Sequence, residues 1–470
     1  MAKVFLFNPP GPHGKGFTRE GRCTQEAGAW ATQWPPVSLA TTAALLEKDC
    51  HRLRILDCPA VALDLLSLEA FIAKAQPDFV FWNTATPTLN DDLNIAGLVK
   101  KAAPDAITGV LGTHVTVLPE IALKNQCIDT VIRREPEQTI TELCIDRDGE
   151  WESIAGISYR DRKSGKIHHN VNRDFLSPED IPSPAWHLLD ITPYRLPLRG
   201  KPFLIVAPIR GCPFPCNFCT APIYYGKRLR KRPVENVVDE IEVNMAGLGV
   251  KDFFVWADTF TADRWYVRQF CQEIMARGID TSWTCNSRVD TVDRETLVLM
   301  KKAGLWMISF GLESGNDDIL KQTGKNITVD QTRCAVSMAH QLGIKTSGHF
   351  ILGLPGETEK SMLETLALSL DLPLDTAQFY AAAPFPGTGL YDQALREGWL
   401  QTASPFSQSR AVMDLPGLSA KRVDAFRRYA YRRFYKRPRT LLSVFSMLES
   451  GAIRDIFRDF TYFFRWTESK

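Results

Sequence analysis

The stretch Arg210-Gly211-Cys212-Pro213-Phe214-Pro215-Cys216-Asn217-Phe218-Cys219 decides how this chain folds and which chemistry it carries. Its cysteines follow a C-x3-C-x2-C spacing on a turn rich in Gly and Pro, so three thiolates can face one point. A four-iron cluster on three thiolates keeps one iron without a protein ligand, whereas electron-carrier clusters usually have four cysteines. The loop therefore predicts an iron–sulfur site with one iron open to chemistry.

A zinc site is the weaker interpretation of this loop. Structural zinc takes four ligands, and the set is usually closed by a second Cys or His at short spacing. The nearest candidates, His187 and Cys271, lie far from the loop in the sequence. Buried structural cysteines are also disfavoured, because packing does not require three thiols so close together.

With Phe218 directly before the last thiol, the loop resembles that of the radical S-adenosylmethionine (SAM) superfamily. In that superfamily the amino and carboxylate groups of SAM occupy the fourth iron. One-electron reduction of SAM then yields methionine and a 5′-deoxyadenosyl radical, which removes a hydrogen atom from the substrate. The resemblance implies a [4Fe-4S] cluster on Cys212, Cys216 and Cys219, with SAM bound beside it.

Length and composition describe an ordinary globular protein of two or three domains, with 470 residues and a net charge of +2. The cysteines outside the loop follow no disulfide pattern, and the first residues lack the features of a signal peptide. We therefore expect a cytoplasmic protein with reduced thiols. No apolar run reaches the ~18 residues of a membrane span, so membrane contact would be peripheral.

Residues 1–145 alternate short apolar runs with helical patterns, in the order of a Rossmann-like, doubly wound parallel sheet. We expect strands at residues 4–7, 53–56, 79–82, 107–111 and 130–132, with helices between them. Ligands of such sheets lie beyond the carboxyl ends of the strands. Small and hydroxyl-bearing residues at those ends leave room for a bulky polar ligand.

This first domain resembles the cobalamin-binding domain of cobalamin-dependent radical SAM enzymes. The likeness rests, in this order, on Asn8-Pro9-Pro10, Trp34-Pro35-Pro36, Gly112-Thr113-His114-Val115-Thr116 and Glu135-Pro136-Glu137. It implies that cobalamin contacts residues at the strand ends, namely Asn8, Pro10, Thr84, Gly112, Thr113, His114 and Glu135. The alternative is a nucleotide-type fold with an empty cleft.

The cobalt ligand is a point at which the chain departs from methionine-synthase-type domains. Those domains use Asp-x-His-x-x-Gly to supply a lower histidine, whereas Asp49-Cys50-His51 is a half match that ends in Arg54. We therefore expect no histidine beneath the cobalt. His114 is expected to contact the corrin ring or its side chains rather than to ligate the metal.

Residues 146–200 are expected to form a linker with a hairpin around Lys163-Ser164-Gly165, followed by a proline-rich connector. From residue 201 to 400 the chain repeats strand then helix about six times, which predicts a partial (βα)6 version of the eightfold, TIM-like barrel. Chemistry in such barrels gathers at the carboxyl ends of the strands.

The residues expected at those strand ends match the groups that SAM presents. Asp258 could accept from the ammonium group, Arg288 could pair with the carboxylate, and Glu313 could bind a ribose hydroxyl or hold Arg288. Pro384 and Gly387, in the loop after the sixth strand, complete the expected SAM contacts. For each of them, a structural ion pair or loop at the barrel mouth is the competing interpretation.

No catalytic residue can be assigned from the sequence, although two side chains on the last strands are candidates. His349 alternates with Phe350 and so faces either the barrel interior or the core, and Tyr380 either packs or lines the substrate cavity.

Residues 401–470 predict a helical segment whose stretch 421–439 is basic with interleaved aromatic residues. It could lie on an anionic membrane, cover the cavity of a hydrophobic or anionic substrate, or be a solvated helix that closes the barrel. No RNA-binding module accompanies it, so nucleic acid is not expected as a partner.

Together the resemblances imply a cobalamin-dependent radical SAM enzyme and favour a C-methyltransferase. One SAM would supply the radical, the substrate radical would take a methyl group from methylcobalamin, and a second SAM would remethylate the reduced cobalt. A flavodoxin- or ferredoxin-like donor would supply the electrons, and oxygen would destroy activity. The alternatives are a non-methylating cyclase or ring-rearranging enzyme acting on a tetrapyrrole, polycyclic lipid or natural product, and a non-catalytic cobalamin- or redox-sensing protein.

Overall fold

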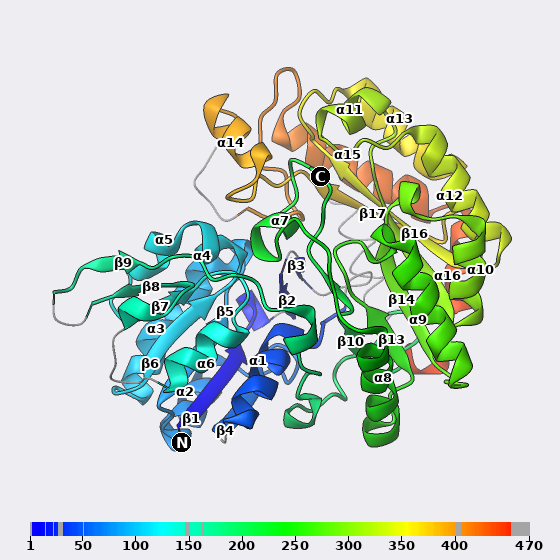
Figure 1. The fold of residues 1–470 in the computed structure, drawn as a ribbon. Coiled ribbons are helices and arrows are strands. Elements are labelled where there is room, and N and C mark those ends of the chain that lie inside the picture. The colour runs from blue at the N-terminus through cyan, green and yellow to red at the C-terminus, as the bar shows by residue number, and fades with distance from the viewer. Residues whose placement is uncertain are drawn as a thin grey trace.

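The computed structural model describes residues 2–14, 16–21, 23–26, 32–49, 51–145, 151–161, 164–400 and 406–452. Two largely parallel sheets, each with its own helices, stand beside one another (Figure 1). This is the α/β architecture that the sequence predicted. Some of the residues on which predictions were based lie outside the described residues, namely Cys50, Lys163 and the tail from residue 453 onward.

The N-terminal sheet has seven strands. Their order is β4 (Arg52–Asp57), β1 (Lys3–Asn8), β5 (Phe79–Asn83), β6 (Ile107–Leu111), β7 (Thr130–Ile132), β8 (Ile157–Arg160) and β9 (Ile167–His169). The strands from β4 to β7 are parallel. Strands β1, β5 and β6 are almost wholly buried, as expected for a sheet covered on both faces.

Alternating side chains of β1 and β5 divide this sheet between two cores. Val4 and Leu6 share one core with helices α1 (Val37–Lys48) and α6 (Glu137–Ile145). Phe5 and Phe7 share the other with α2 (Leu65–Ala75) and α3 (Leu89–Ala102). The helices therefore cover both faces, which is the doubly wound arrangement.

The hairpin β8–β9 differs from its expected place. It was assigned to the linker, yet β8 pairs with β7 antiparallel and continues the N-terminal sheet. Backbone hydrogen bonding explains this, because the edge of β7 would otherwise stay unpaired. The connector to the second unit therefore begins after β9.

The second sheet has six parallel strands in chain order. They are β10 (Phe203–Val206), β13 (Asp252–Val255), β14 (Ser282–Ser287), β15 (Leu305–Glu313), β16 (Lys345–Leu352) and β17 (Thr376–Ala381). The outer helices are α8 (Val234–Leu248), α9 (Arg264–Ala276), α10 (Arg294–Lys302), α12 (Val329–Gln341) and α13 (Glu359–Asp371). Strands β10 and β17 are the two ends of the order, so the sheet is a partial barrel that does not close.

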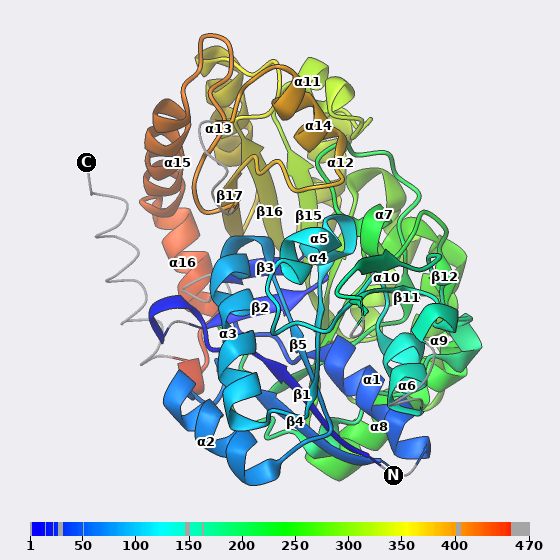
Figure 2. The same ribbon diagram turned by 90° about the vertical axis from the view of Figure 1, so that its left-hand side faces the viewer.

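The basic helix α15 (Ala420–Tyr435) covers the open edge at β17 (Figure 2). The Tyr435 hydroxyl accepts from the amide of Ala377 at 3.1 Å and donates to the same residue's carbonyl at 2.8 Å. The Tyr431 hydroxyl accepts from the amide of Phe379, whose carbonyl accepts from Arg427 Nε, both at 3.0 Å. Side chains thus take the place of a seventh strand at this edge of the open sheet. This contact fits the interpretation of the segment as a helix packed on the barrel, while contact with a membrane or with a substrate stays a prediction.

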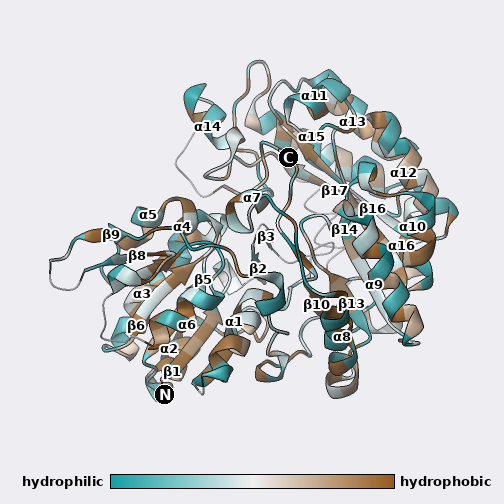
Figure 3. Cartoon of the chain, viewed as in Figure 1, coloured by the Kyte–Doolittle hydropathy of each residue, from teal (hydrophilic) through white to brown (hydrophobic). Residues whose placement is uncertain are grey.

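Apolar residues gather on the sheets and on the helix faces turned toward them, while the outer helix faces are hydrophilic (Figure 3). Within the described part of the chain, no helix has both the length and the apolar character needed to cross a membrane.

Candidate active site

The three-cysteine loop follows the short strand β11 (Ile209–Arg210) and is held on both flanks. Gly211 has a φ of 89°, and a Cβ there would lie 2.2 Å from the carbonyl oxygen of Arg228, so only glycine fits this position. The Cys212 amide donates to the Gly226 carbonyl at 3.1 Å, and the Asn217 amide donates to the Thr323 carbonyl at 2.9 Å. These contacts pre-form the loop.

Cys212, Cys216 and Cys219 form no disulfide with one another, and all three line one cavity of about 330 Å³. The pKa of the Cys216 thiol is raised overall, mainly by burial and also by the charges of Glu313 and Cys212, while Lys325 and Arg288 lower it. Among the described residues, no three His, Cys, Asp or Glu side chains converge on a single metal ion. A cubane does not need such convergence, because each thiolate binds a different iron. The donor set therefore fits a [4Fe-4S] cluster.

Two cations stand beside Cys216. Arg288 Nη1 lies 3.8 Å from its Sγ, and the guanidinium carbon lies 3.8 Å from the ring centroid of Phe214. Arg288 also pairs with Asp290 and donates to the Lys325 carbonyl at 2.7 Å. Lys325 Nζ in turn pairs with Glu313 Oε1 at 2.7 Å. Positive charge close to the thiolates favours their ionised form.

The five residues expected to contact SAM divide into those that line the cavity and those that do not. Asp258, Arg288 and Glu313 line the cavity, and so does Phe385, which lies between the two predicted loop residues. Pro384 and Gly387 do not appear in that lining, and a Cβ on Gly387 would lie 2.8 Å from Val117 Cγ2 in the N-terminal unit. The roles of all five predicted residues toward SAM stay predictions.

His349 and Tyr380 both line the cavity, so the ambiguity of their direction is settled in favour of the interior. The Tyr380 hydroxyl lies 3.4 Å from His349 Nδ1 and donates to Gln378 Oε1. His349 Nε2 lies 3.5 Å from Ser347 Oγ.

The expected cobalamin contacts lie at the carboxyl ends of the N-terminal strands. Two of them, Pro10 and Thr113, contact the hairpin of β2 (Phe17–Glu20) and β3 (Cys23–Glu26). Many of their polar groups are already bonded. Asn8 Oδ1 accepts from Asn83 at 2.9 Å, Thr84 Oγ1 donates to the Leu111 carbonyl at 2.9 Å, and Thr113 Oγ1 donates to the Gly21 carbonyl at 3.1 Å. The Pro10 carbonyl accepts from Arg19, and Gly112, with φ of 138°, packs against the carbonyl of Thr84.

His114 offers the clearest fit to a ligand at this edge. Its Nδ1 contacts Thr86 Oγ1 at 3.3 Å, whereas its buried Nε2 has no hydrogen-bond partner among the described residues. Burial lowers the pKa of His114 to about 4, so the imidazole is neutral. A buried, unsatisfied nitrogen is costly, and a cobalamin group could satisfy it.

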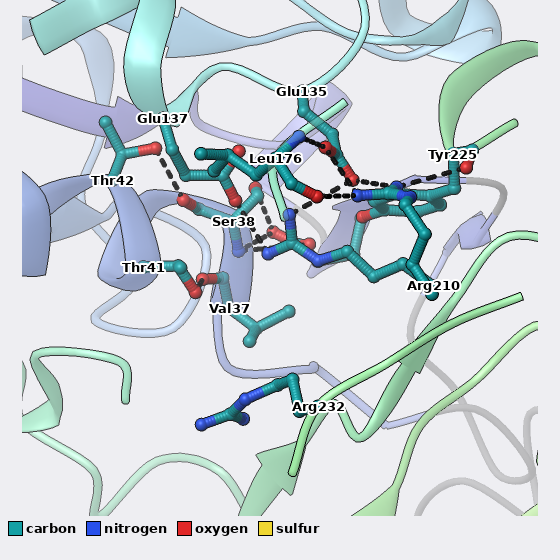
Figure 4. Close-up of polar contacts among 12 residues, drawn as sticks. Val37, Ser38, Thr41, Thr42, Glu135, Glu137, Leu176, Arg210, Tyr225 and Arg232 are labelled. Atoms are coloured by element: carbon teal, nitrogen blue, oxygen red, sulfur yellow. Dashed lines mark hydrogen bonds and ion pairs between the residues drawn. The ribbon is translucent and has the colours of Figure 1, made fainter. Parts of the chain in front are cut away.

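An ionic cluster joins the two units immediately before the cysteine loop (Figure 4). Arg210 donates to Glu137 at 2.6 Å and lies 3.2 Å from Glu135, and Arg230 donates to Glu135 at 3.0 Å. Ser38 Oγ donates to the buried carboxyl of Glu20 at 2.7 Å. Glu135 therefore binds arginines of the second unit, and its expected contact with cobalamin stays a prediction.

The sequence did not single out Lys325, Gln378, Arg210 or Arg230. Lys325 follows a glycine in a loop between two helices, without a distinctive spacing. Gln378 could have been found, because it alternates with Tyr380 on a strand whose inner face was already in question. The arginines become recognisable only when two distant segments meet.

Comparison with known proteins agrees with this geometry. The radical SAM superfamily model matches residues 206–369, and the B12 binding domain model matches residues 28–144. An uncharacterized methyltransferase of Pyrococcus horikoshii, PH0819, is 33% identical over 417 residues, covering 87% of this chain and 90% of that protein. An anaerobic magnesium-protoporphyrin IX monomethyl ester cyclase of Rubrivivax gelatinosus is 29% identical over 374 residues, covering 77% and 67%.

Among solved structures, the radical SAM methyltransferase TsrM of Kitasatospora setae, with cobalamin and a [4Fe-4S] cluster bound, superposes with a TM-score of 0.70. The match covers 96% of this chain and 90% of that one at 16% identity, so it shows the shared fold. The family models place a B12 binding domain before a radical SAM domain that contains the three-cysteine loop of this chain. The chain belongs to the cobalamin-dependent radical SAM enzymes.

Proposed function

We propose that this enzyme is a C-methyltransferase that acts on an unactivated carbon of a small molecule. The observation that carries the proposal is one cavity that residues of both units line. Its lining includes the three cysteines, the inner faces of β14 to β17, and Gln25, Thr32 and Trp34 of the N-terminal unit. A chamber shared by both units suits a reaction in which both cofactors serve one substrate, and the Pyrococcus relative named as a methyltransferase supports it.

When bound, the cluster and SAM supply the radical, and cobalamin supplies the methyl group. The chain's own contribution is to bind and to orient. Three cysteines hold the cluster on a pre-formed loop, and Arg288 and Lys325 place positive charge beside it. His114 presents a neutral imidazole nitrogen for a cobalamin contact.

Anaerobic turnover with SAM that carries a deuterated methyl group tests this function. Methyl transfer consumes two SAM molecules, so S-adenosylhomocysteine and 5′-deoxyadenosine should form in equal amounts, and the product should carry the deuterated methyl group. Formation of 5′-deoxyadenosine with almost no S-adenosylhomocysteine, and an unlabelled product, would contradict it.

A cyclase or ring-rearranging activity is the second candidate, because the Rubrivivax cyclase aligns with 77% of this chain. The two candidates share cluster and SAM but differ in the fate of the methyl group. The ratio of S-adenosylhomocysteine to 5′-deoxyadenosine therefore separates them.

A flavodoxin- or ferredoxin-like protein is proposed as the electron donor, and the cytoplasm, where thiols stay reduced, as the location. The sequence suggested a hydrophobic or anionic substrate and a peripheral membrane contact through the C-terminal segment. The exposed basic residues Lys421, Arg433 and Lys436 on and next to α15 would serve that contact.

A further inference from the structure

The inner wall of the partial barrel is built in layers, because neighbouring parallel strands are in register. Asn286, Ser309, Ser347 and Thr376 are paired in one layer across β14 to β17. All four line the cavity. In a filled barrel such inner positions hold bulky branched residues. Short polar side chains leave space here and present hydroxyl and amide groups to it.

The next layer toward the cluster brings together Gly311, His349 and Gln378. Tyr380 joins them, through its contact with His349 Nδ1 at 3.4 Å and its hydrogen bond to Gln378. Gly311 adds no side chain, and the Lys325–Glu313 ion pair fills the place of one, because a Cβ there would lie 2.6 Å from Glu313 Oε1 and 2.8 Å from Lys325 Nζ. The contacts within the group fix the directions in which the His349, Gln378 and Tyr380 groups point.

Another part of the wall is apolar. It consists of Leu196, Leu198, Phe203, Phe254, Trp34 and Trp306. Trp34 packs edge-on against Phe254 with ring centroids 4.7 Å apart, and the Arg199 guanidinium lies over Trp306 at 5.1 Å. These contacts hold flat surfaces in place, against which a ring can pack.

Charge is confined to the cluster end of the cavity. The charged residues of the lining are Asp258 and Arg288, which follow strands β13 and β14, Glu313 at the end of β15, and Lys325 in the loop between α11 (Asp317–Gln322) and α12. Arg288 is paired with Asp290 at 2.9 Å, and Lys325 with Glu313 at 2.7 Å. The Lys325–Glu313 pair reaches the layer of Gly311, whereas the layer of Asn286, Ser309, Ser347 and Thr376 contains no charged residue. A charged group buried there would lack a counter-ion, which is costly.

We propose that the substrate is an uncharged ring compound with several hydroxyl or amide groups, whose ring packs on the aromatic wall while its polar groups bond the layers around His349 and Gln378. The proposal rests on the proposed function only in placing the substrate in this cavity. The lining favours such a molecule over the hydrophobic or anionic one that the sequence suggested.

The test uses the reconstituted full-length holoenzyme, deuterated-methyl SAM and a metabolite extract of the producing organism divided into three fractions. One fraction passes through both anion and cation exchangers, one is retained by the anion exchanger, and one is the chloroform-soluble lipid. Stimulation of 5′-deoxyadenosine formation by each fraction is measured, as is the compound that co-elutes with the protein in gel filtration. We expect the uncharged water-soluble fraction to stimulate and to supply the retained compound.

Matched variants tie the result to the cavity. His349→Leu, and independently Gln378→Met, should lower two quantities about five- to tenfold, the size of a lost hydrogen bond. These are the stimulation of 5′-deoxyadenosine formation by the uncharged fraction and the amount of compound that co-elutes with the protein. His340→Leu, at an exposed histidine near the end of α12, should behave like the unaltered enzyme. Iron content and circular dichroism verify that each variant is folded and loaded.

If the anionic fraction, the lipid fraction or no fraction stimulates 5′-deoxyadenosine formation, the proposed substrate class is wrong. It is also wrong if the His349 and Gln378 variants respond to the fractions as His340→Leu does. Stimulation by the uncharged fraction with a product that lacks the deuterated methyl group would contradict methyl transfer while leaving the substrate class standing.

Discussion

The Arg210 guanidinium, two residues before the first cluster cysteine, donates to Glu137 Oε1 at 2.6 Å across the junction between the two units. Both side chains are buried. Burial disfavours the charged guanidinium, yet the carboxylates of Glu137 and Glu135 raise the pKa of Arg210 overall. This pair therefore anchors the cysteine loop to the cobalamin-binding domain.

Arg210→Met should destabilise the folded enzyme by about 3–5 kcal/mol, because it leaves buried carboxylates without a counter-ion. Urea unfolding of the full chain measures this. Arg277→Met is the control, since Arg277 pairs with three carboxylates at the surface and should matter little. Equal effects of the two substitutions would contradict an anchoring role for Arg210.

Glu20 predicts a pH dependence of stability. Burial raises the pKa of its carboxyl to about 8, Ser38 hydrogen bonds and Arg210 lower it, and Glu137 raises it. The unfolded chain releases this proton near the ordinary glutamate pKa of 4.5, so between about pH 4.5 and about pH 8 the folded state binds more protons. This contribution to stability is present at low pH and is lost as the pH rises through that window.

Glu20→Gln should therefore flatten the fall in the free energy of unfolding between about pH 5 and about pH 8.5, a fall of about 1.4 kcal/mol for each pH unit within the window. Urea unfolding at both pH values checks this. Asp57 and Glu357 also have raised pKa values, so the slope should shrink rather than vanish. An unchanged slope would show that Glu20 is not protonated in the folded state.

Gly324→Ala should displace the cysteine loop. The glycine has a φ of 69°, and a Cβ would lie 2.5 Å from the Pro215 carbonyl oxygen next to Cys216. Iron retained after reconstitution should fall several-fold. Gly343→Ala has the same backbone strain, with φ of 68°, but no atom within 4 Å. Iron loss in both variants would trace the effect to strain alone.

Tyr435→Phe should cost about 1–3 kcal/mol, because the buried amide and carbonyl of Ala377 lose their partner at the edge of β17. Thermal or urea unfolding measures the change. Tyr429→Phe, on the exposed side of the same helix, serves as the control. A negligible change in the free energy of unfolding of Tyr435→Phe would mean that this side chain does not stabilise the open edge of the sheet at β17.

Local signals were sufficient for the parallel strands of both sheets and for the cluster loop, whereas the hairpin β2–β3 and the short helices α4 (Thr113–Val117) and α5 (Pro119–Leu123) were not predicted. The strand at 130–132 and the six strand–helix units follow from hydrophobic periodicity, and the cysteines follow from spacing. The place of β8–β9 was missed, because edge pairing depends on which strand is left open after folding. The Arg210–Glu137 contact joins residues 73 positions apart, and nothing in either segment announces it.

In the candidate site, too, residues with a local sequence signal were predicted, and residues that depend on tertiary contacts were not. Asp258, Arg288 and Glu313 were predicted from their positions after strands, and all three line the cavity. Lys325 was not predicted, because its pairing with Glu313 depends on a loop that folds back over the sheet. The direction of His349 was undecided until the register with Gln378 was known.

Mössbauer and electron paramagnetic resonance spectroscopy of the anaerobically reconstituted full chain, before and after addition of SAM, is the decisive test of an open iron on the three-cysteine loop. We expect a [4Fe-4S] cubane in which one iron site is distinct and changes its signal when SAM is added. Absence of a cubane, or a cluster whose irons do not respond to SAM, would contradict it.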